Sequence, residues 1–295
     1  VFEGGKYFGD PTLIRFGKAL LSEKQLNTSS VMDFLFTLHA YGDTTNVVKD
    51  ERNTKNQSFY WLPDLQVLTA KTPDEDLFFA AKGGHNAESH NHNDVGNFIL
   101  YVKGYPVLVD AGSGDYTAVT FSSKRYTLWN MQSAWHNCPD INGQMQKDGA
   151  RFKAMDVSFS KRNREVSFAM DLAHAYPPEA AVESWKRSFL FDQVKKQLKL
   201  TEDYRLKNLV SAPQIHFLCA VEPQVEKEGV IDFVSGDQTL LRCLYDKDKV
   251  QVFIEEKRMN GDETLSRSWG EKLYRLTFKV KGKDLNNHLA FVFKK

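Results

Sequence analysis

The sequence predicts a mainly β protein, a large antiparallel β-sandwich (supersandwich) preceded by a short helical segment. Three observations predict this class. Short runs of β-branched and aromatic residues, separated by polar turns, recur from residue 59 to the end of the 295-residue chain. No helical crossovers interrupt them, so neighbouring strands are expected to pair antiparallel. Aromatic residues make up 13% of the chain, which suits apolar sheet faces.

Two amphipathic helices are expected at the start of the chain. The first, over residues 10–21, begins with an aspartate N-cap followed by proline at the first helical position. The second, over residues 29–42, ends at a glycine. Residues 43–57 are polar and are expected to form a linker. The predicted domains are therefore a helical segment with its linker, residues 1–57, and a β-sandwich, residues 58–295.

The expected strands are short apolar runs bounded by turn residues. They cover residues 65–71, 77–82, 97–102, 105–111, 151–160, 166–175, 185–191, 197–202, 215–221, 230–234, 239–245, 250–256, 272–280 and 288–293. Tight polar turns join several of them. The turns at 103–104, 246–248 and 281–283 are each expected to close an antiparallel hairpin.

Composition narrows the possible functions. The 39 Lys and Arg residues nearly balance the 38 Asp and Glu residues, and no basic run is present, so no nucleic-acid partner is expected. Cys138, Cys219 and Cys243 are far apart, which indicates buried thiols rather than a disulfide framework or a thiolate zinc site. We expect no membrane span, and a chain that starts at Val1 without a methionine is expected to be a mature form or a piece of a longer protein.

A polar cluster lies between two expected strands, at residues 83–94, and holds three of the eight histidines. His90 and His92 are two residues apart, so on an extended segment both imidazoles would lie on one face and could hold one ion. Asp110, at the end of a following strand, and His136, in a long polar loop, are the candidates for further ligands. The pattern indicates a transition-metal site, and the alternative is a hydrogen-bonded surface loop.

A cationic and aromatic set follows this cluster. Arg125, Tyr126 and Trp129 suit an anionic sugar, because a guanidinium binds its carboxylate and an aromatic ring stacks on its pyranose ring. Tyr116 is expected either to line the same cleft or to fill a corner of the sandwich. A packed loop with a salt-bridged arginine is the alternative for this set.

Several common enzyme motifs are absent from the sequence, and their absence argues against the corresponding enzyme classes. The sequence has no phosphate-binding glycine loop, no G-x-S-x-G nucleophile elbow and no H-E-x-x-H helix. His174, His216 and His288 lie in expected strands and are expected to be structural.

Residues 83–114, followed by 120–126 and 133–137, closely resemble the C-terminal half of the heparinase II/III family of polysaccharide lyases. The resemblance is carried by H-x-H, then G-x-P-V-x-V-D-x-G, then H-N ahead of Asn142-Gly143-Gln144. It extends more weakly to Lys295, and the N-terminal helices resemble the tail of that family's helical domain.

The resemblance implies an (α/α) toroid joined to an antiparallel β-sandwich, and cleavage of uronate polysaccharides such as heparin, heparan sulfate or alginate by β-elimination. His90 resembles the family's catalytic or substrate-contacting histidine of the sandwich. His92, Asp110 and His136 resemble the ligands of one structural zinc ion, with Mn²⁺ or Ca²⁺ as alternatives.

The same resemblance implies that important groups are missing. The tyrosine that acts as acid or base, and the Asn or His that neutralises the uronate, lie in the family's toroid, and neither Tyr7 nor Tyr41 has a matching context. The chain alone is therefore expected to be weakly active or inactive, with an acidic polysaccharide and the N-terminal helical domain as partners. A periplasmic or secreted bacterial protein is implied.

Two other classes compete with the lyase. Gly84 followed after five residues by His90-Asn91-His92 fits the opening of the motif of cupin-type metal enzymes, although Val95-Gly96-Asn97 stands where their glutamate is expected. A non-catalytic carbohydrate-binding or scaffold module, in which the cluster only holds loops together, is the third possibility.

Overall fold

The computed structural model describes residues 9–10, 13–14 and 58–295. The chain divides into two compact units, Val1–Lys55 and Asn56–Lys295. The expected linker, the second expected helix and the boundary proposed after residue 57 lie outside the described residues.

The predicted helix start at Asp10 is confirmed in the described part of the first unit. Leu13 and Ile14 are helical. The Asp10 carboxylate accepts a hydrogen bond from the Leu13 N–H at 3.2 Å, and its carbonyl accepts one from the Ile14 N–H at 3.1 Å. This is the bonding pattern of an N-cap residue.

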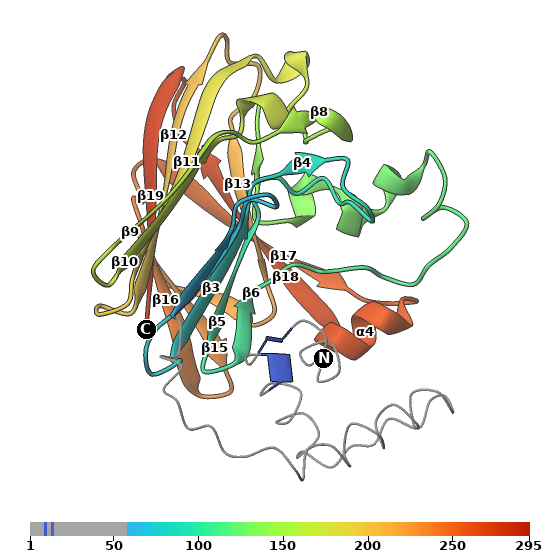
Figure 1. Ribbon diagram of the computed structural model, residues 1–295. Helices are drawn as coiled ribbons and strands as arrows, with labels where there is room; N and C mark the ends of the chain where they lie inside the picture. The colour runs from blue at the N-terminus through green and yellow to red at the C-terminus, as the bar shows by residue number, and fades with distance from the viewer. Residues whose placement is uncertain (1–8, 11–12, 15–57) are drawn as a thin grey trace, which may run out of the picture. The chain divides into compact units, whose positions relative to one another are not determined.

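The second unit consists of two large antiparallel sheets stacked face to face (Figure 1), which confirms the predicted β-sandwich. The first sheet has nine strands. In pairing order they are β1 (Phe59–Leu62), β2 (Val67–Lys71), β3 (Leu77–Lys82), β5 (Phe98–Val102), β6 (Tyr105–Leu108), β13 (Gln214–Cys219), β18 (Lys272–Val280) and β17 (Val250–Arg258), with β7 (Pro139–Asp140) also paired to β13.

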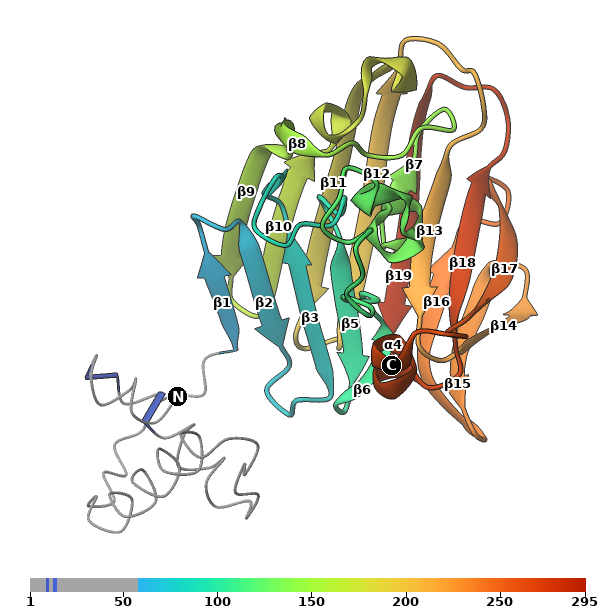
Figure 2. The same ribbon diagram turned by 90° about the vertical axis from the view of Figure 1, so that its right-hand side faces the viewer.

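The second sheet has eight strands. In pairing order they are β14 (Glu222–Lys227), β15 (Val230–Ser235), β16 (Gln238–Tyr245), β19 (Asn286–Lys294), β12 (Gln197–Leu206), β11 (Val182–Asp192), β10 (Glu165–Asp171) and β9 (Met155–Arg162). A small separate ladder joins β4 (His85–Asn86) to β8 (Gly149–Lys153). Figure 2 shows the first sheet in front, with the loop that joins β6 to β8 lying over it.

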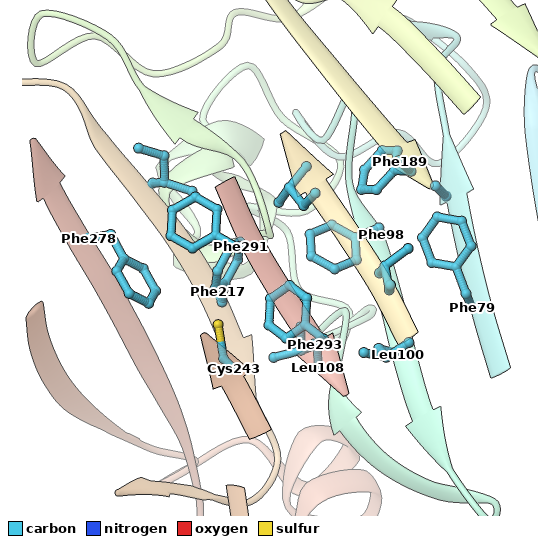
Figure 3. Packing of buried hydrophobic residues seen from close by; sticks show 14 of the residues in the cluster. Phe79, Phe98, Leu100, Leu108, Phe189, Phe217, Cys243, Phe278, Phe291 and Phe293 are labelled. Carbon is cyan, nitrogen blue, oxygen red and sulfur yellow. The ribbon is translucent and has the colours of Figure 1, made fainter. Parts of the chain in front are cut away.

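The core lies between the two sheets and is rich in phenylalanine (Figure 3). Alternate residues of each strand point inward, as the buried positions of β3 and β11 show. Phe79 of the first sheet lies 5.2 Å from Phe189 of the second, and Phe217 lies 5.3 Å from Phe291, measured between ring centroids. Each fully buried phenylalanine contributes about 1.5–3 kcal/mol relative to an exposed one.

Only one of the three predicted hairpins forms. Lys103 and Gly104 both have positive φ and join the paired strands β5 and β6. The turns at 246–248 and 281–283 instead carry the chain from one sheet to the other, because β16 and β19 belong to the second sheet while β17 and β18 belong to the first. Those two hairpin predictions were wrong, since local turn residues do not determine which strand becomes the partner.

Several short elements differ from the sequence expectation. The expected strand at 166–175 ends at Asp171 and is followed by a 3₁₀ turn, Ala173–Ala175, so the prediction that His174 lies in a strand was wrong. One short helix, α4 (Glu263–Trp269), was not predicted, although Asp262 caps it through the Leu265 N–H and Gly270 follows it.

The three cysteines are buried and free, as predicted. No helix in the described residues has the length and apolar character needed to cross a membrane.

Candidate metal centre

His90 and His92 lie on a turn between β4 and β5, not on a strand. His90 has a left-handed backbone, with φ +59°, and its side chain is exposed, whereas His92 is buried. The left-handed residue breaks the alternation that an extended segment would impose. The prediction that both imidazoles share one face was therefore wrong, and only His92 points into the protein.

The structure brings together the side chains of His92, Asp110 and His136. Their donor atoms all lie within 4.8 Å of one another. His136 Nδ1 lies 3.1 Å from Asp110 Oδ2, and the rings of His92 and His136 have centroids 5.3 Å apart. The three residues come from different segments: the turn before β5, the stretch just after β6, and the loop after a 3₁₀ turn, Ser133–Trp135.

His136 provides a direct test of whether these residues fit a metal ion. Its side chain is fully buried, at 0% exposure, and neither ring nitrogen has a hydrogen-bond partner. The approach of Nδ1 to Asp110 is close but does not have hydrogen-bond geometry. Buried polar atoms without a partner are rare and costly, and two imidazoles with one carboxylate form a typical donor set for a transition metal. The residues therefore fit a metal ion.

The charges in the cluster also suit a cation. Burial and the neighbouring His136 lower the pKa of His92, which favours the neutral imidazole that binds metals. Burial would raise the pKa of Asp110, but the charge of His136 and its contact hold that pKa well below the usual range. Burial likewise opposes protonation of His136, yet Asp110 raises its pKa. Without a metal, their proximity favours a protonated His136 beside an ionised Asp110.

One asparagine bonds Asp110 and a second asparagine supports the first; neither of them was assigned a role from the sequence. Asn97 Nδ2 donates to Asp110 Oδ2 at 2.6 Å, and the Gly112 N–H donates to Oδ1 at 2.7 Å. Asn137, which follows His136, donates its own N–H to Asn97 Oδ1 at 3.0 Å and its side-chain amide to the Val109 carbonyl at 3.0 Å. Both oxygens of the Asp110 carboxylate therefore accept a hydrogen bond, which fixes its orientation.

The turn that carries His92 is held by buried polar side chains. Gln146 Oε1 accepts from Asn86 Nδ2 and from the Val95 N–H, each at 3.0 Å, and Gln146 Nε2 donates to the Val95 carbonyl at 2.8 Å. Lys82 and Asp94 form an ion pair at 2.9 Å across the same turn. Buried side-chain hydrogen bonds and one ion pair therefore hold the turn in place.

Arg125 joins the loop after β6 to the histidine turn. Its Nε and Nη2 donate to the Asn91 carbonyl at 3.1 and 3.0 Å, and its Nη1 donates to the Thr120 carbonyl at 3.1 Å. The guanidinium thus contacts main chain immediately beside His90 and His92. Its predicted contact with a sugar carboxylate stays a prediction.

The three aromatic residues predicted to bind substrate differ in their surroundings. Trp129 is half-buried against Trp135, with ring centroids 5.2 Å apart, and Lys257 Nζ lies 5.0 Å from its ring centroid. Tyr126 is half-buried, whereas Tyr116 is 56% exposed and lies 5.5 Å from the exposed ring of Phe121. Tyr116 is the most accessible of the three.

Comparison with known families identifies a similar domain. Residues 65–201 match the family model of the heparinase II/III-like C-terminal domain. The resemblance seen in the motifs is confirmed. The matched segment contains all three candidate ligands. A comparison with curated proteins found no match.

Solved structures show the same fold. Heparan sulfate lyase HepC from Pedobacter heparinus superposes with a TM-score of 0.66 and 16% identity, over 95% of this chain and 41% of that one. A mutant of that enzyme gives 0.67 and 15%, with the same coverage. The heparinase III BT4657 gene product gives 0.63 and 11%, over 94% of this chain and 41% of that one. The chain thus spans about two fifths of the length of these lyases.

Proposed function

We propose that this chain is the metal-binding β-sandwich part of a polysaccharide lyase that cleaves uronic-acid-containing polysaccharides by β-elimination. The observation that carries the proposal is the buried His136, whose ring nitrogens lack hydrogen-bond partners while His92 and Asp110 lie beside it. The heparinase-like family match of the surrounding segment supplies the reaction class. Heparan sulfate and related glycosaminoglycans are the first substrates to test, because the similar solved proteins include heparan sulfate lyases.

In this proposal His92, Asp110 and His136 hold one zinc ion. The ion fixes the turn and the loop that carry its ligands, and it takes no part in bond breaking. Zinc is favoured over calcium because two of the three donors are imidazole nitrogens, whereas calcium prefers oxygen ligands. The exposed side chain of His90, two residues from a ligand, is then presented to the substrate from a rigid turn.

The reaction requires three groups. One neutralises the uronate carboxylate, a base removes the C5 proton, and an acid protonates O4 as the C4–O4 bond breaks and the C4–C5 double bond forms. We assign His90 to contact the sugar at the reacting centre from the sandwich side. The acid or base tyrosine and the neutralising Asn or His would come from a helical domain of the same, exported protein.

The first experiment measures zinc in the purified chain by elemental analysis. About one zinc per chain is expected, with zinc lost in His92→Ala and Asp110→Ala because each removes one donor. His288→Ala is the matched control, since His288 also pairs with an aspartate, Asp203 at 2.6 Å, but on the surface. Absence of zinc from the unmodified chain after incubation with the metal, or retention in both ligand variants, would refute the assigned site.

The second experiment measures activity of the full-length protein, helical domain included, on heparan sulfate, chondroitin sulfate and alginate. Formation of the unsaturated uronate is expected on one of them, and His90→Ala should lower kcat by about 10²–10⁴-fold while zinc content is unchanged. Sugar binding without product on all three would favour the carbohydrate-binding module.

A further inference from the structure

A buried ion pair lies in the interior of the sandwich, outside the candidate metal centre. Arg187 of β11 and Glu202 of β12 are both fully buried, at 0% exposure. Arg187 Nε donates to Glu202 Oε1 at 2.8 Å, and Nη2 donates to the same oxygen. Trp185 Nε1 donates to Glu202 Oε2 at 2.8 Å. Both carboxylate oxygens are thus bonded on the second-sheet side.

Stability of the core alone does not account for this pair. Desolvation of two charges costs several kcal/mol, and well-packed apolar residues of similar volume often stabilise a protein as much or more. The neighbouring inward positions of β11, Trp185 and Phe189, are apolar and fully packed. The remaining contacts of the guanidinium indicate what the pair does.

Arg187 reaches across the interior to the loops of the first sheet. Its Nη1 donates to the carbonyl of Gly96 at 2.8 Å and to the carbonyl of Asn137. Gly96 lies in a turn with φ +83°, and both carbonyls point into the sandwich rather than into a strand ladder. One cation therefore binds the turn that follows His92 and the loop that follows His136.

Hydrogen bonds continue from the segments of Gly96 and Asn137 to Asp110, the third candidate ligand. The Asn137 N–H donates to Asn97 Oδ1 at 3.0 Å, and Asn97 Nδ2 donates to Asp110 Oδ2 at 2.6 Å. Asn97 directly follows Gly96, so Arg187 holds the main chain on both sides of this connection. His136 thus adjoins a residue that Arg187 bonds, Asp110 is bonded to Asn97, and His92 lies four residues before Gly96 in the same turn.

We propose that the Arg187–Glu202 pair positions the ligands of the metal centre. Glu202 orients the guanidinium of Arg187. The guanidinium in turn sets the spacing of the segments that carry His92, Asp110 and His136. The inference rests on the proposed zinc site and adds residues of the opposite sheet to it. Arg187 touches neither the metal nor a substrate.

The test is the zinc affinity of Arg187→Lys, measured by competition with a chromophoric chelator. Lysine keeps the positive charge beside Glu202, but a single ammonium group cannot bond Glu202 and both carbonyls in the fixed geometry of a guanidinium. We expect the zinc Kd to rise by about 10–100-fold, as is typical when residues that orient metal ligands are changed. The absorption spectrum of the Co²⁺-loaded variant should also differ from that of the unmodified protein.

Arg242→Lys is the matched control. Arg242 donates to Asp232 through the same two nitrogens, Nε and Nη2, in the same sheet, at 2.6 and 2.7 Å, and within the described residues no hydrogen bond joins it to the loops of the centre. This variant should bind zinc within about twofold of the unmodified protein. Equal zinc affinity and Co²⁺ spectra in Arg187→Lys and the unmodified protein, whatever the change in Tm, would overturn the inference while leaving the zinc site intact. Absence of zinc from the unmodified protein would overturn the site itself.

A measurement on the unmodified chain covers the case in which Arg187→Lys does not fold. In protein with ¹⁵N-labelled arginine, the guanidinium Nε–H of Arg187 is the signal expected to exchange most slowly with water, since Arg187 is the one fully buried arginine in the described residues. Addition of zinc should shift this signal and leave that of Arg242 in place. No shift at saturating zinc would contradict a link between the pair and the metal centre.

Discussion

Two buried histidines of this protein lie beside an aspartate, and their surroundings differ. His136 Nδ1 lies 3.1 Å from Asp110, and His216 Nε2 lies 3.3 Å from Asp140. His216 also has a hydrogen bond of 2.9 Å between Nδ1 and the hydroxyl of Thr277. His136 has no hydrogen bond at either ring nitrogen, and a second imidazole, that of His92, lies next to it.

The difference shows what distinguishes a candidate metal ligand from a structural histidine. A hydrogen bond to one nitrogen fixes the ring of His216 between β13 and β18, the pair of strands that carry it and Thr277. At His136 neither nitrogen has a hydrogen bond, and three donors converge. A histidine–aspartate contact alone is therefore weak evidence for a metal, whereas unpartnered nitrogens with a third donor are strong evidence.

The largest expected effect comes from replacing each histidine of the two pairs. His136→Gln should abolish stoichiometric zinc binding, because it removes a donor at the centre of the cluster. His216→Gln should keep about one zinc per chain and lower only Tm, since it breaks a structural contact. Elemental analysis and thermal unfolding distinguish the two. Zinc loss in both variants would mean that the pairs do not differ in function.

Removal of the metal should have the next largest effect. A ligand that binds only the folded state stabilises it by about 2.7 kcal/mol at a free concentration of 100 times Kd. A strong chelator should therefore lower the Tm of the unmodified protein and of His216→Gln, and leave that of His136→Gln unchanged. A chelator effect of equal size in His136→Gln would place the metal elsewhere.

Changing the residue that supports each pair should have a smaller effect. Asn97→Ala removes the amide that donates to Asp110 and should weaken zinc binding by about 10–100-fold. Thr277→Val removes the hydroxyl partner of His216 and should cost about 1–3 kcal/mol of stability without changing zinc affinity. Chelator competition and urea unfolding measure the two quantities. The reverse pattern would contradict the assigned roles.

The smallest expected effect is a pH dependence of the zinc-free protein. Asp110 raises the pKa of His136 against the effect of burial, so the charged pair stabilises the fold fully below the unfolded pKa of about 6.5. That contribution should be lost as pH rises through the higher folded pKa. Urea unfolding with chelator present should show the difference in stability between the unmodified protein and His136→Gln shrinking over that range. A difference that grows with pH would contradict the direction of the shift.

Much of the fold could be predicted from the sequence because strands leave a local signal. Runs of β-branched and aromatic residues bounded by turns predicted β3, β5 and β18 almost to the residue. The convergence of His92, Asp110 and His136 was predicted from motif spacing and family resemblance, since each residue lies at a strand end or in an adjoining loop. The left-handed turn at His90 was not predicted, because an H-x-H pattern fits an extended segment equally well.

Arg187 and Glu202 were not singled out, because their roles depend on contacts between distant parts of the chain. Arg187 bonds carbonyls that are 50 and 91 residues away in sequence. A signal was nevertheless present. Arg187 occupies an inward position between Trp185 and Phe189, and Glu202 occupies the matching inward position of the next strand. Opposite charges on the apolar faces of adjacent strands are unusual enough to mark a buried network.

The three buried thiols have a consequence for the redox behaviour of the protein. Burial raises the pKa of Cys138, Cys219 and Cys243, so little of the reactive thiolate is present. The candidate metal donors are nitrogen and oxygen atoms, which do not form disulfides. Oxidants that release zinc from cysteine-based sites should therefore leave this centre loaded, and the sandwich should keep its structure in oxidising and reducing surroundings alike.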